Sequence, residues 1–373
     1  YTKFGDIPYT TKVLSIKESM SIARTDRATV IANMLADLDE VINGNYLPTS
    51  YDADNKGRIT RWAAMAIKAK IYLFEGNWTQ VKNITSTIMT EGGFTLFGSY
   101  AGLFEIANEY NSEVILDAQY RPTSREHQMM YAFLPPSLGG YSQLSPLQEL
   151  VDSYIMLDGK TIKETGTSFD ESNPYANRDP RLKATVMYTG NSYTLADGTE
   201  VVINCEKGEG KDGYGVGSDC SATGYYIKKY WDNTYRATLY SGLNPILIRY
   251  ADILLMNAEA LAELGELDKM AWDATIKPIR DRAGFTLTSA VEFPEGASKD
   301  KLIEIVRNER RSELALEGHR HKDIIRWRIA DDVLNGWCHG LKTNEVVGTD
   351  NGYVRVENRT FNANRHYLWP IPQ

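Results

Sequence analysis

The sequence is poor in cysteine, with three in 373 residues, which excludes a small disulfide-stapled scaffold. Cys205 and Cys220 flank a glycine-rich loop, and the sequence leaves open whether they form a disulfide. No apolar run approaches the roughly 18 residues that cross a bilayer, so we expect no membrane span. With 41 Lys plus Arg against 49 Asp plus Glu, the net charge is −8. This deficit of positive charge argues against a nucleic-acid binder.

Signatures of covalent or cofactor-dependent catalysis are also lacking. There is no Gly-x-Ser-x-Gly elbow, and no cysteine has a nucleophile signature around it. Gly208, Gly210 and Gly213 have the spacing of a dinucleotide fingerprint, but no helix start follows them. We therefore predict no catalytic residue and no cofactor. A glycosidase carboxylate pair stays open, because its two members need only meet in space.

Two patterns imitate metal sites without completing them. Residues 52–57 resemble the opening of a calcium loop, but Ala63 stands where a bidentate glutamate is required. His319 and His321 are too close in sequence for an i, i+4 zinc pair. The charged residues around the two histidines favour ion pairs that fix helix ends. We predict no metal ligands.

Helical periodicity begins near the N-terminus. From Thr25 to Gly44, apolar residues recur at steps of three and four, which predicts a helix with Thr25 as N-cap and Gly44 as its stop. A second helix is predicted after Thr60 and a third from Trp78. The two-residue break at 76–77 folds the second and third helices back on each other.

The same pattern returns in the C-terminal third. Apolar periodicity predicts helices over 250–264 and 267–282, although Pro278 is a local inconsistency in the second, since an interior proline kinks or splits a helix. A predicted helix capped by Ser298 includes Leu314 and Leu316 and is ended by Gly318, and a further helix over about 322–334 follows. Two helical hairpins with small residues at the packing seam are typical of tetratricopeptide-like (TPR-like) repeats.

Between residues 93 and 244 the helical period is lost. Short apolar or alternating runs at 113–120, 182–188, 200–204 and 225–230 predict small strands between long loops. We therefore predict a mostly α fold, in which TPR-like helical hairpin repeats support an irregular loop-rich lobe with short β-strands. The predicted parts are an N-terminal TPR-like helical part (1–92), the loop-rich lobe (93–244) and a C-terminal TPR-like helical part packing with the first (245–373).

Tyrosine is unusually abundant, with 23 Tyr against 10 Phe. Many of these tyrosines gather between residues 188 and 240, interleaved with Asp, Asn and Arg. A sugar ring offers an apolar C–H face and a rim of hydroxyls, so a carbohydrate site needs a flat aromatic platform beside polar side chains. The predicted ligand-binding residues are Tyr193, Tyr214, Trp231, Asp232, Asn233, Tyr235 and Arg236.

A set of segments along nearly the whole chain resembles the SusD/RagB family, the glycan-binding outer-membrane lipoproteins of Bacteroidetes-type starch-utilisation systems. Each segment alone is weak, but their colinear order is specific. They include Phe4-Gly5-Asp6-Ile7-Pro8, Arg178-Asp179-Pro180-Arg181, Gly224-Tyr225-Tyr226, Ile248-Arg249-Tyr250-Ala251-Asp252, Glu317-Gly318-His319-Arg320 and Tyr367-Leu368-Trp369-Pro370-Ile371-Pro372.

The resemblance implies a role as well as a fold. A protein of this family captures a glycan at the cell surface and passes it to a SusC-like TonB-dependent transporter, with no bond cleaved. The helical repeats would face the transporter, and the lobe would present its loops to the sugar. The implied location is the outer membrane, where the protein is a surface-exposed lipoprotein. Its only attachment to the membrane is an N-terminal lipid anchor, which is absent from this chain.

The resemblance also leaves several questions open. Family members carry further helices ahead of the Phe-Gly-Asp segment and usually continue past the Pro-Ile-Pro ending. We therefore expect a chain truncated at both ends, with part of the sugar site missing. The glycan itself is not specified. Two alternatives are a structural partner of the transporter without a sugar site of its own, and a glycoside hydrolase.

Overall fold

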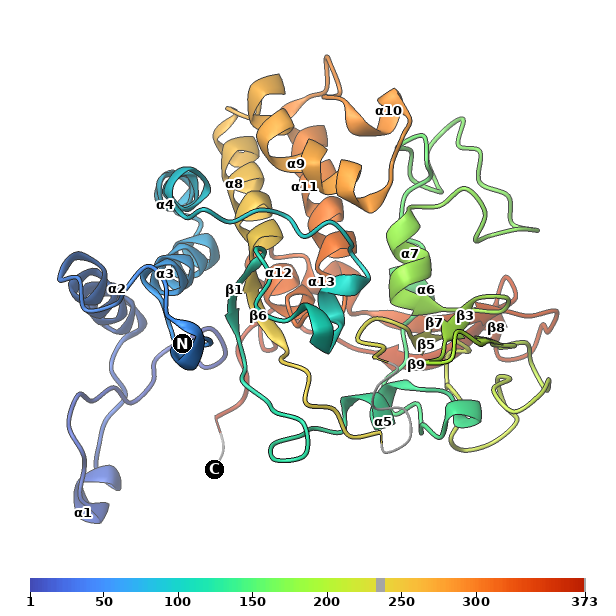
Figure 1. Cartoon of the computed structure of the whole chain (residues 1–373), viewed down its shortest axis with the longest axis horizontal. Helices are drawn as coiled ribbons and strands as arrows, with labels where there is room; N and C mark the ends of the chain where they lie inside the picture. The colour runs from blue at the N-terminus through green and yellow to red at the C-terminus, as the bar shows by residue number, and fades with distance from the viewer. Residues whose placement is uncertain (233–238, 372–373) are drawn as a thin grey trace.

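The computed structural model describes residues 1–232 and 239–371. Helical hairpins form one side of the molecule, and a lobe of loops and short strands forms the other (Figure 1), as the sequence predicts. The α-helices of the described residues are α1 (Ile16–Ser19), α2 (Arg27–Asn43), α3 (Arg61–Glu75), α4 (Trp78–Glu91), α5 (Met129–Phe133), α6 (Gln148–Val151), α7 (Pro180–Thr185), α8 (Tyr250–Leu264), α9 (Lys269–Ala283), α10 (Thr288–Val291), α11 (Lys299–Glu313), α12 (Arg320–Arg326) and α13 (Ala330–Val333).

The N-terminal helices start and stop close to their predicted positions, with one correction. Thr60 caps α3, and Gly76 ends it in the left-handed conformation with φ of 68°. α2, however, is capped by Asp26, whose side chain accepts a hydrogen bond from the amide of Thr29 at 2.9 Å. Thr25 was the wrong choice of cap because its backbone instead pairs with Ile7 in a β-bridge.

The helical hairpins from the two ends of the chain form one array. α3 packs on α4, α4 packs on α8, and α8 packs on both α9 and α11. Fully buried alanines, among them Ala63 and Ala66 of α3 and Ala260 of α8, belong to the core between these helices and permit their close approach. Asn257 of α8 adds a polar contact by donating to the hydroxyl of Thr85 in α4 at 2.9 Å.

The helix predicted over 267–282 is confirmed as α9, and two other predictions about the C-terminal helices are wrong. α9 continues through Pro278, because burial of neighbouring apolar residues such as Ile276 and Ile279 outweighs one missing backbone hydrogen bond. The helix capped by Ser298 ends at Glu313 and does not extend to Leu316, whose φ is 64°. The helix predicted over 322–334 is divided into α12 and α13, with a left-handed residue at Arg328 between them.

The strands make small antiparallel sheets in place of one large sheet. Among the described residues the pairs are β1–β6, β2–β5 and β3–β4, and a three-stranded sheet has the order β7-β9-β8. The prediction of a strand over 182–188 is wrong for the first half of this range, which lies in α7. The strands are β1 (Val114–Asp117), β2 (Val186–Met187), β3 (Ser192–Thr194), β4 (Glu200–Val202), β5 (Tyr226–Ile227), β6 (Ile246–Arg249), β7 (Gly336–Lys342), β8 (Thr349–Asp350) and β9 (Tyr353–Arg359).

The three-stranded sheet lies beside the lobe although it belongs to the C-terminal end of the sequence (Figure 1). The amide of Leu341 in β7 donates to the carbonyl of Thr223 at 2.7 Å. Gly224 makes this approach possible, since a Cβ there would lie 1.7 Å from Leu341 Cδ2. The predicted boundary at residue 244 does not anticipate a C-terminal sheet that contacts the lobe. The division of the chain into three parts stays a prediction.

His339 is a second attachment of this sheet. Its Nδ1 lies 2.8 Å from Glu149 of α6 and its Nε2 lies 3.0 Å from Asp350 of β8. Both ring nitrogens face carboxylates, and both donate only when the imidazole is charged. Burial by itself lowers the pKa of His339, but the two carboxylates outweigh burial and raise this pKa.

The stabilisation from His339 should therefore depend on pH. A raised folded-state pKa gives a contribution that is fully present below about pH 6.5 and is lost as the pH rises through the folded value. Urea unfolding of the wild type and His339→Gln should differ by about 0.5–1 kcal/mol at pH 6, because the carboxylates are part-exposed. The difference should shrink by pH 9. A constant difference across this range would contradict the charged bridge.

Candidate functional site

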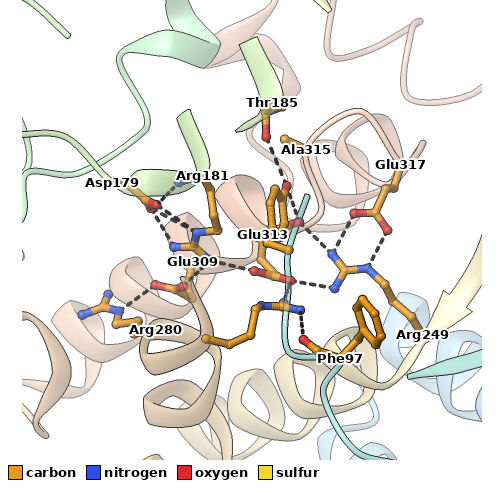
Figure 2. Close-up of polar contacts among 12 residues, drawn as sticks. Phe97, Asp179, Arg181, Thr185, Arg249, Arg280, Glu309, Glu313, Ala315 and Glu317 are labelled. Carbon is orange, nitrogen blue, oxygen red and sulfur yellow. Dashed lines mark hydrogen bonds and ion pairs between the residues drawn. The ribbon is translucent and has the colours of Figure 1, made fainter. Parts of the chain in front are cut away.

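A buried network of charges joins the lobe to the helical array (Figure 2). Arg181 of α7 is fully buried and pairs with Asp179 at 2.7 Å. The same guanidinium reaches Glu309 at 2.7 Å and Glu313 at 2.9 Å, both on α11. Glu309 also accepts from Arg280 of α9 at 2.8 Å. These pairs fix the position of α7 on the helices.

Arg249, at the start of α8, is the second centre of the network (Figure 2). Its Nη1 lies 2.6 Å from Glu313 and 2.7 Å from Glu113, and its Nη2 lies 2.7 Å from Glu317. Lys229, from the lobe, pairs with Glu317 at 2.7 Å. The network therefore links residues that are far apart in the sequence.

The arginines keep the carboxylates of this network ionised. Burial by itself raises the pKa of Glu317, but Arg249 and Lys229 outweigh burial and lower this pKa to about 2. Glu313 is affected in the same way by Arg282, Arg249 and Arg181, and its pKa falls well below the usual range. A general acid must carry a proton at working pH, so these glutamates are unsuited to the role of general acid. Their ion pairs connect the start of α8 and the lobe to the end of α11.

Most of the aromatic cluster predicted from the sequence packs the interior of the lobe. Tyr225, Tyr226 and Tyr230 are 2%, 0% and 8% exposed. Tyr193 is 0% exposed, and its hydroxyl donates to the carbonyl of Ile227 at 2.9 Å. A ring without exposed surface does not contact a ligand, so the role predicted for Tyr193 is corrected to that of a support.

The remaining predicted site residues occupy different positions. Trp231 is half-buried on the ring of Tyr193, with centroids 4.9 Å apart, and its indole nitrogen donates to the carbonyl of Thr194. Tyr214 is half-buried against the lobe core. Asp232 is 5% exposed and accepts from the amide of Ile106 at 2.9 Å. Three further predicted residues lie outside the described residues: Asn233, Tyr235 and Arg236.

The structure brings together an aromatic group that the sequence analysis missed. Tyr131 of α5 and Tyr141 of the following loop stack with ring centroids 4.3 Å apart and an interplanar angle of 24°. The amide of Tyr141 donates to the carbonyl of Tyr131 at 2.9 Å, which fixes the pair. Tyr141 and Tyr240 are 41% and 45% exposed. We call Tyr131, Tyr141 and Tyr240 the tyrosine platform.

The platform has polar surroundings. The pKa of Tyr131 is raised chiefly by its hydrogen bond with Tyr141, with smaller contributions that include the nearby Asp219 and Tyr240. Phenol hydroxyls and a carboxylate beside flat apolar rings are the combination that a sugar requires. No periodic signal marks this group, since α5 has five residues and Tyr141 lies in the loop after it. Only the fold shows that these rings are neighbours.

The cysteines form no disulfide, and the described residues include no metal-binding cluster. Cys205, Cys220 and Cys338 are free thiols, so the possible Cys205–Cys220 disulfide is not formed here. Burial raises the pKa of Cys205 to about 12, which makes this thiol a poor nucleophile. Over residues 1–232 and 239–371, no group of three or more His, Cys, Asp or Glu side chains is placed to hold a metal ion.

With this geometry established, comparison with known proteins gives the family. The model of the SusD family matches residues 103–373, which is more than half of the chain. The chain belongs to the SusD family. In the part of the chain that the structure describes, no helix is long and apolar enough to cross a membrane.

Known relatives, with and without solved structures, support this family assignment. A SusD-like carbohydrate-binding protein of Bacteroides fragilis superimposes with a TM-score of 0.87 at 29% identity, over 100% of this chain and 74% of that one. SusD-like protein P25 of Formosa agariphila is 28% identical over 89% of this chain and 61% of its own length. The chain thus spans less than two thirds of that relative. A laminarin-binding SusD-like protein shares the fold, with a TM-score of 0.60, 23% identity and coverage of 89% and 68%.

Proposed function

We propose that this protein binds glycans at the cell surface without cleaving them and delivers them to a SusC-like TonB-dependent transporter in the outer membrane. The observation that carries the proposal is the tyrosine platform, whose exposed rings lie on the loop-rich side of the molecule. Family membership supports the same reading, because the solved relative from Bacteroides fragilis is described as a carbohydrate-binding protein.

The platform supplies the flat surface and the rigidity that sugar binding requires. Tyr131 and Tyr141 support each other by stacking, so little side-chain freedom is lost when a sugar packs on the outer face of Tyr141. Trp231, which rests on Tyr193, is a second candidate contact. We retain Tyr214, Trp231 and Asp232 in the proposed site, together with Asn233, Tyr235 and Arg236.

The absence of bond cleavage is part of the proposal. Glycosidases need one carboxyl that donates a proton and one that stays ionised. In the buried network of Figure 2 the arginines hold Glu313 and Glu317 in the charged form. Neither residue can then donate the proton, and on this proposal incubation with soluble polysaccharides releases no reducing sugar. Release that is abolished by one Asp or Glu substitution would establish the glycosidase alternative.

Binding is tested by calorimetric titration with a panel of soluble neutral oligosaccharides. Tyr141→Ala should weaken the binding of a captured glycan by about 10-fold, because an aromatic contact contributes up to about 1.5 kcal/mol. Tyr141→Phe keeps the ring and should bind nearly as the wild type does. Tyr46→Ala removes an exposed ring at the end of α2 and serves as a control. If no glycan binds the wild type, the proposal fails.

Delivery to a transporter is tested separately. The protein should co-purify with its cognate TonB-dependent transporter, and the complex should survive Tyr141→Ala, since the platform would face the sugar. A complex that forms normally while every glycan fails to bind would favour the structural-partner alternative.

A further inference from the structure

A deep cavity lies among α6, the end of α11, α12, α13 and the start of β7, and it shares no lining residue with the tyrosine platform. We call it the α12 cavity. Its volume is about 670 Å³, within the range of about 300–1,000 Å³ that is typical of small-ligand sites. Part of its wall is aliphatic, formed by residues such as Leu147, Leu314 and Ile324.

Two arginines of the α12 cavity lack a carboxylate partner. Within residues 1–232 and 239–371, no Asp or Glu oxygen lies at ion-pair distance from Arg311 or Arg320. The hydrogen bond of Arg311 goes to the backbone carbonyl of Glu149 at 2.5 Å. Burial, followed by the charge of Arg320, lowers the pKa of Arg311 to about 10. Two neighbouring positive charges are thus held in a partly desolvated hollow, where an anion would stabilise both.

The carboxylates that line the cavity either pair with other side chains or are exposed to solvent. Glu149 is bound to His339 at 2.8 Å. Asp323 pairs with Arg310 and with Arg326, each at 2.9 Å. Asp332 is exposed on α13. None of these acids forms an ion pair with Arg311 or Arg320, although Glu149 and Asp323 favour their charged forms from a longer distance.

One wall of the α12 cavity is aromatic. Trp337, at the start of β7, is 43% exposed and lines the cavity. The guanidinium of Arg355 lies 5.7 Å from the centre of its ring system, which holds the indole in place. Leu316, also in the lining, has φ of 64°. Backbone strain of this kind concentrates at functional sites.

We propose that the α12 cavity binds an anionic sugar residue, whose ring stacks on Trp337 and whose oxyanion is held by Arg311 and Arg320. The inference rests on the proposed function, since it names the glycan class. A planar guanidinium donates two parallel hydrogen bonds to a carboxylate or a sulfate, so the oxyanion is that of a uronic acid or of a sulfate ester. An acidic polypeptide offers the same charge, but the flat exposed indole favours a sugar.

The test is calorimetric titration with charged and neutral forms of the same sugars. Oligogalacturonides are compared with their methyl-esterified forms, and sulfated galactan oligosaccharides with their desulfated forms. In at least one pair the charged form should bind at least 10-fold more tightly, because a hydrogen bond to a charged group contributes about 1.5–3 kcal/mol. Equal affinity within both pairs would overturn the proposal. The pair that shows the difference identifies the oxyanion.

Variants locate the binding. The double variant Arg311→Gln/Arg320→Gln should bind the charged sugar at least 10-fold more weakly. Trp337→Ala should weaken the binding of both the charged and the neutral form. Arg320→Lys keeps the positive charge but loses the parallel pair of guanidinium donors. Its affinity for the charged sugar should lie between those of the wild type and the double variant. Arg328→Gln removes an exposed arginine outside the cavity and is the matched control. Unchanged affinity in the double variant would overturn the assignment.

The outcomes separate this inference from the proposed function. If neutral glycans bind in a Tyr141-dependent way and no charged sugar is preferred, the α12 cavity proposal fails while the proposed function stands. If no glycan of either kind binds, both fail. An acidic amphipathic peptide that binds through Arg311 and Arg320, with no sugar doing so, would make the cavity a polypeptide-docking site and would also overturn the proposal. Thermal unfolding of each variant confirms that it is folded.

Discussion

Arg249→Met should lower the free energy of unfolding by about 3–5 kcal/mol, because removal of one partner leaves buried charges uncompensated. The side chain of Arg249 is 1% exposed and its partners Glu113, Glu313 and Glu317 are between 0% and 2% exposed. Methionine fills similar volume, so the loss comes from charge. Urea-induced unfolding followed by tryptophan fluorescence measures the change.

Arg355→Met is the matched control for this prediction. Its pair with Asp350 is 38% exposed on both sides, and an exposed ion pair contributes at most about 1 kcal/mol. The two variants make the same chemical change at a buried and at an exposed site. If Arg249→Met were no more destabilising than Arg355→Met, the buried network would have no structural role.

Gly224→Ala should be the second severely destabilising change, by about 2–5 kcal/mol. The glycine has φ of 76°, and the added methyl group would lie 1.7 Å from Leu341 Cδ2. The expected result combines left-handed backbone strain with a clash that separates β7 from the lobe. Gly215→Ala carries the strain alone, since φ there is 77° and nothing lies within 4 Å, and it should cost about 1–2 kcal/mol.

A double-mutant cycle with Leu341→Ala isolates the clash. Shortening Leu341 removes the two atoms closest to the new methyl group, Cδ2 and Cγ, so the two substitutions should couple favourably by at least about 1 kcal/mol. Additive effects would show that the lobe relaxes away from β7 and that the contact with Leu341 is not the cause.

The sequence predicted elements whose signals are local. Thr60 and Gly76 bracket α3 because a cap oxygen and a left-handed stop act within one helical turn. α8 was predictable because its apolar residues repeat along fifteen residues. α9 was predictable in spite of Pro278, because the local cost of the proline is smaller than the gain from packing this helix. Colinear motifs then gave the family.

The candidate site was far less predictable. A high local density of tyrosine gives no information about which rings face solvent. Tyr193 was therefore assigned to the binding site, whereas in the structure its hydroxyl is hydrogen-bonded inside the lobe. The platform depends on Tyr131 and Tyr141 meeting across a loop. The unpaired state of Arg311 and Arg320 depends on where α12 begins relative to α11. Such facts are set by tertiary contacts that residue spacing does not encode.

The packing of α4 on α8 has a consequence for biosynthesis. The α3–α4 hairpin leaves the ribosome before α8 and must then wait while residues 92–249 are made, roughly 8–30 s at about 5–20 residues per second. During this interval the surface that α8 will cover is open to water and to other nascent chains. Slower translation of the intervening segment would lengthen this exposure.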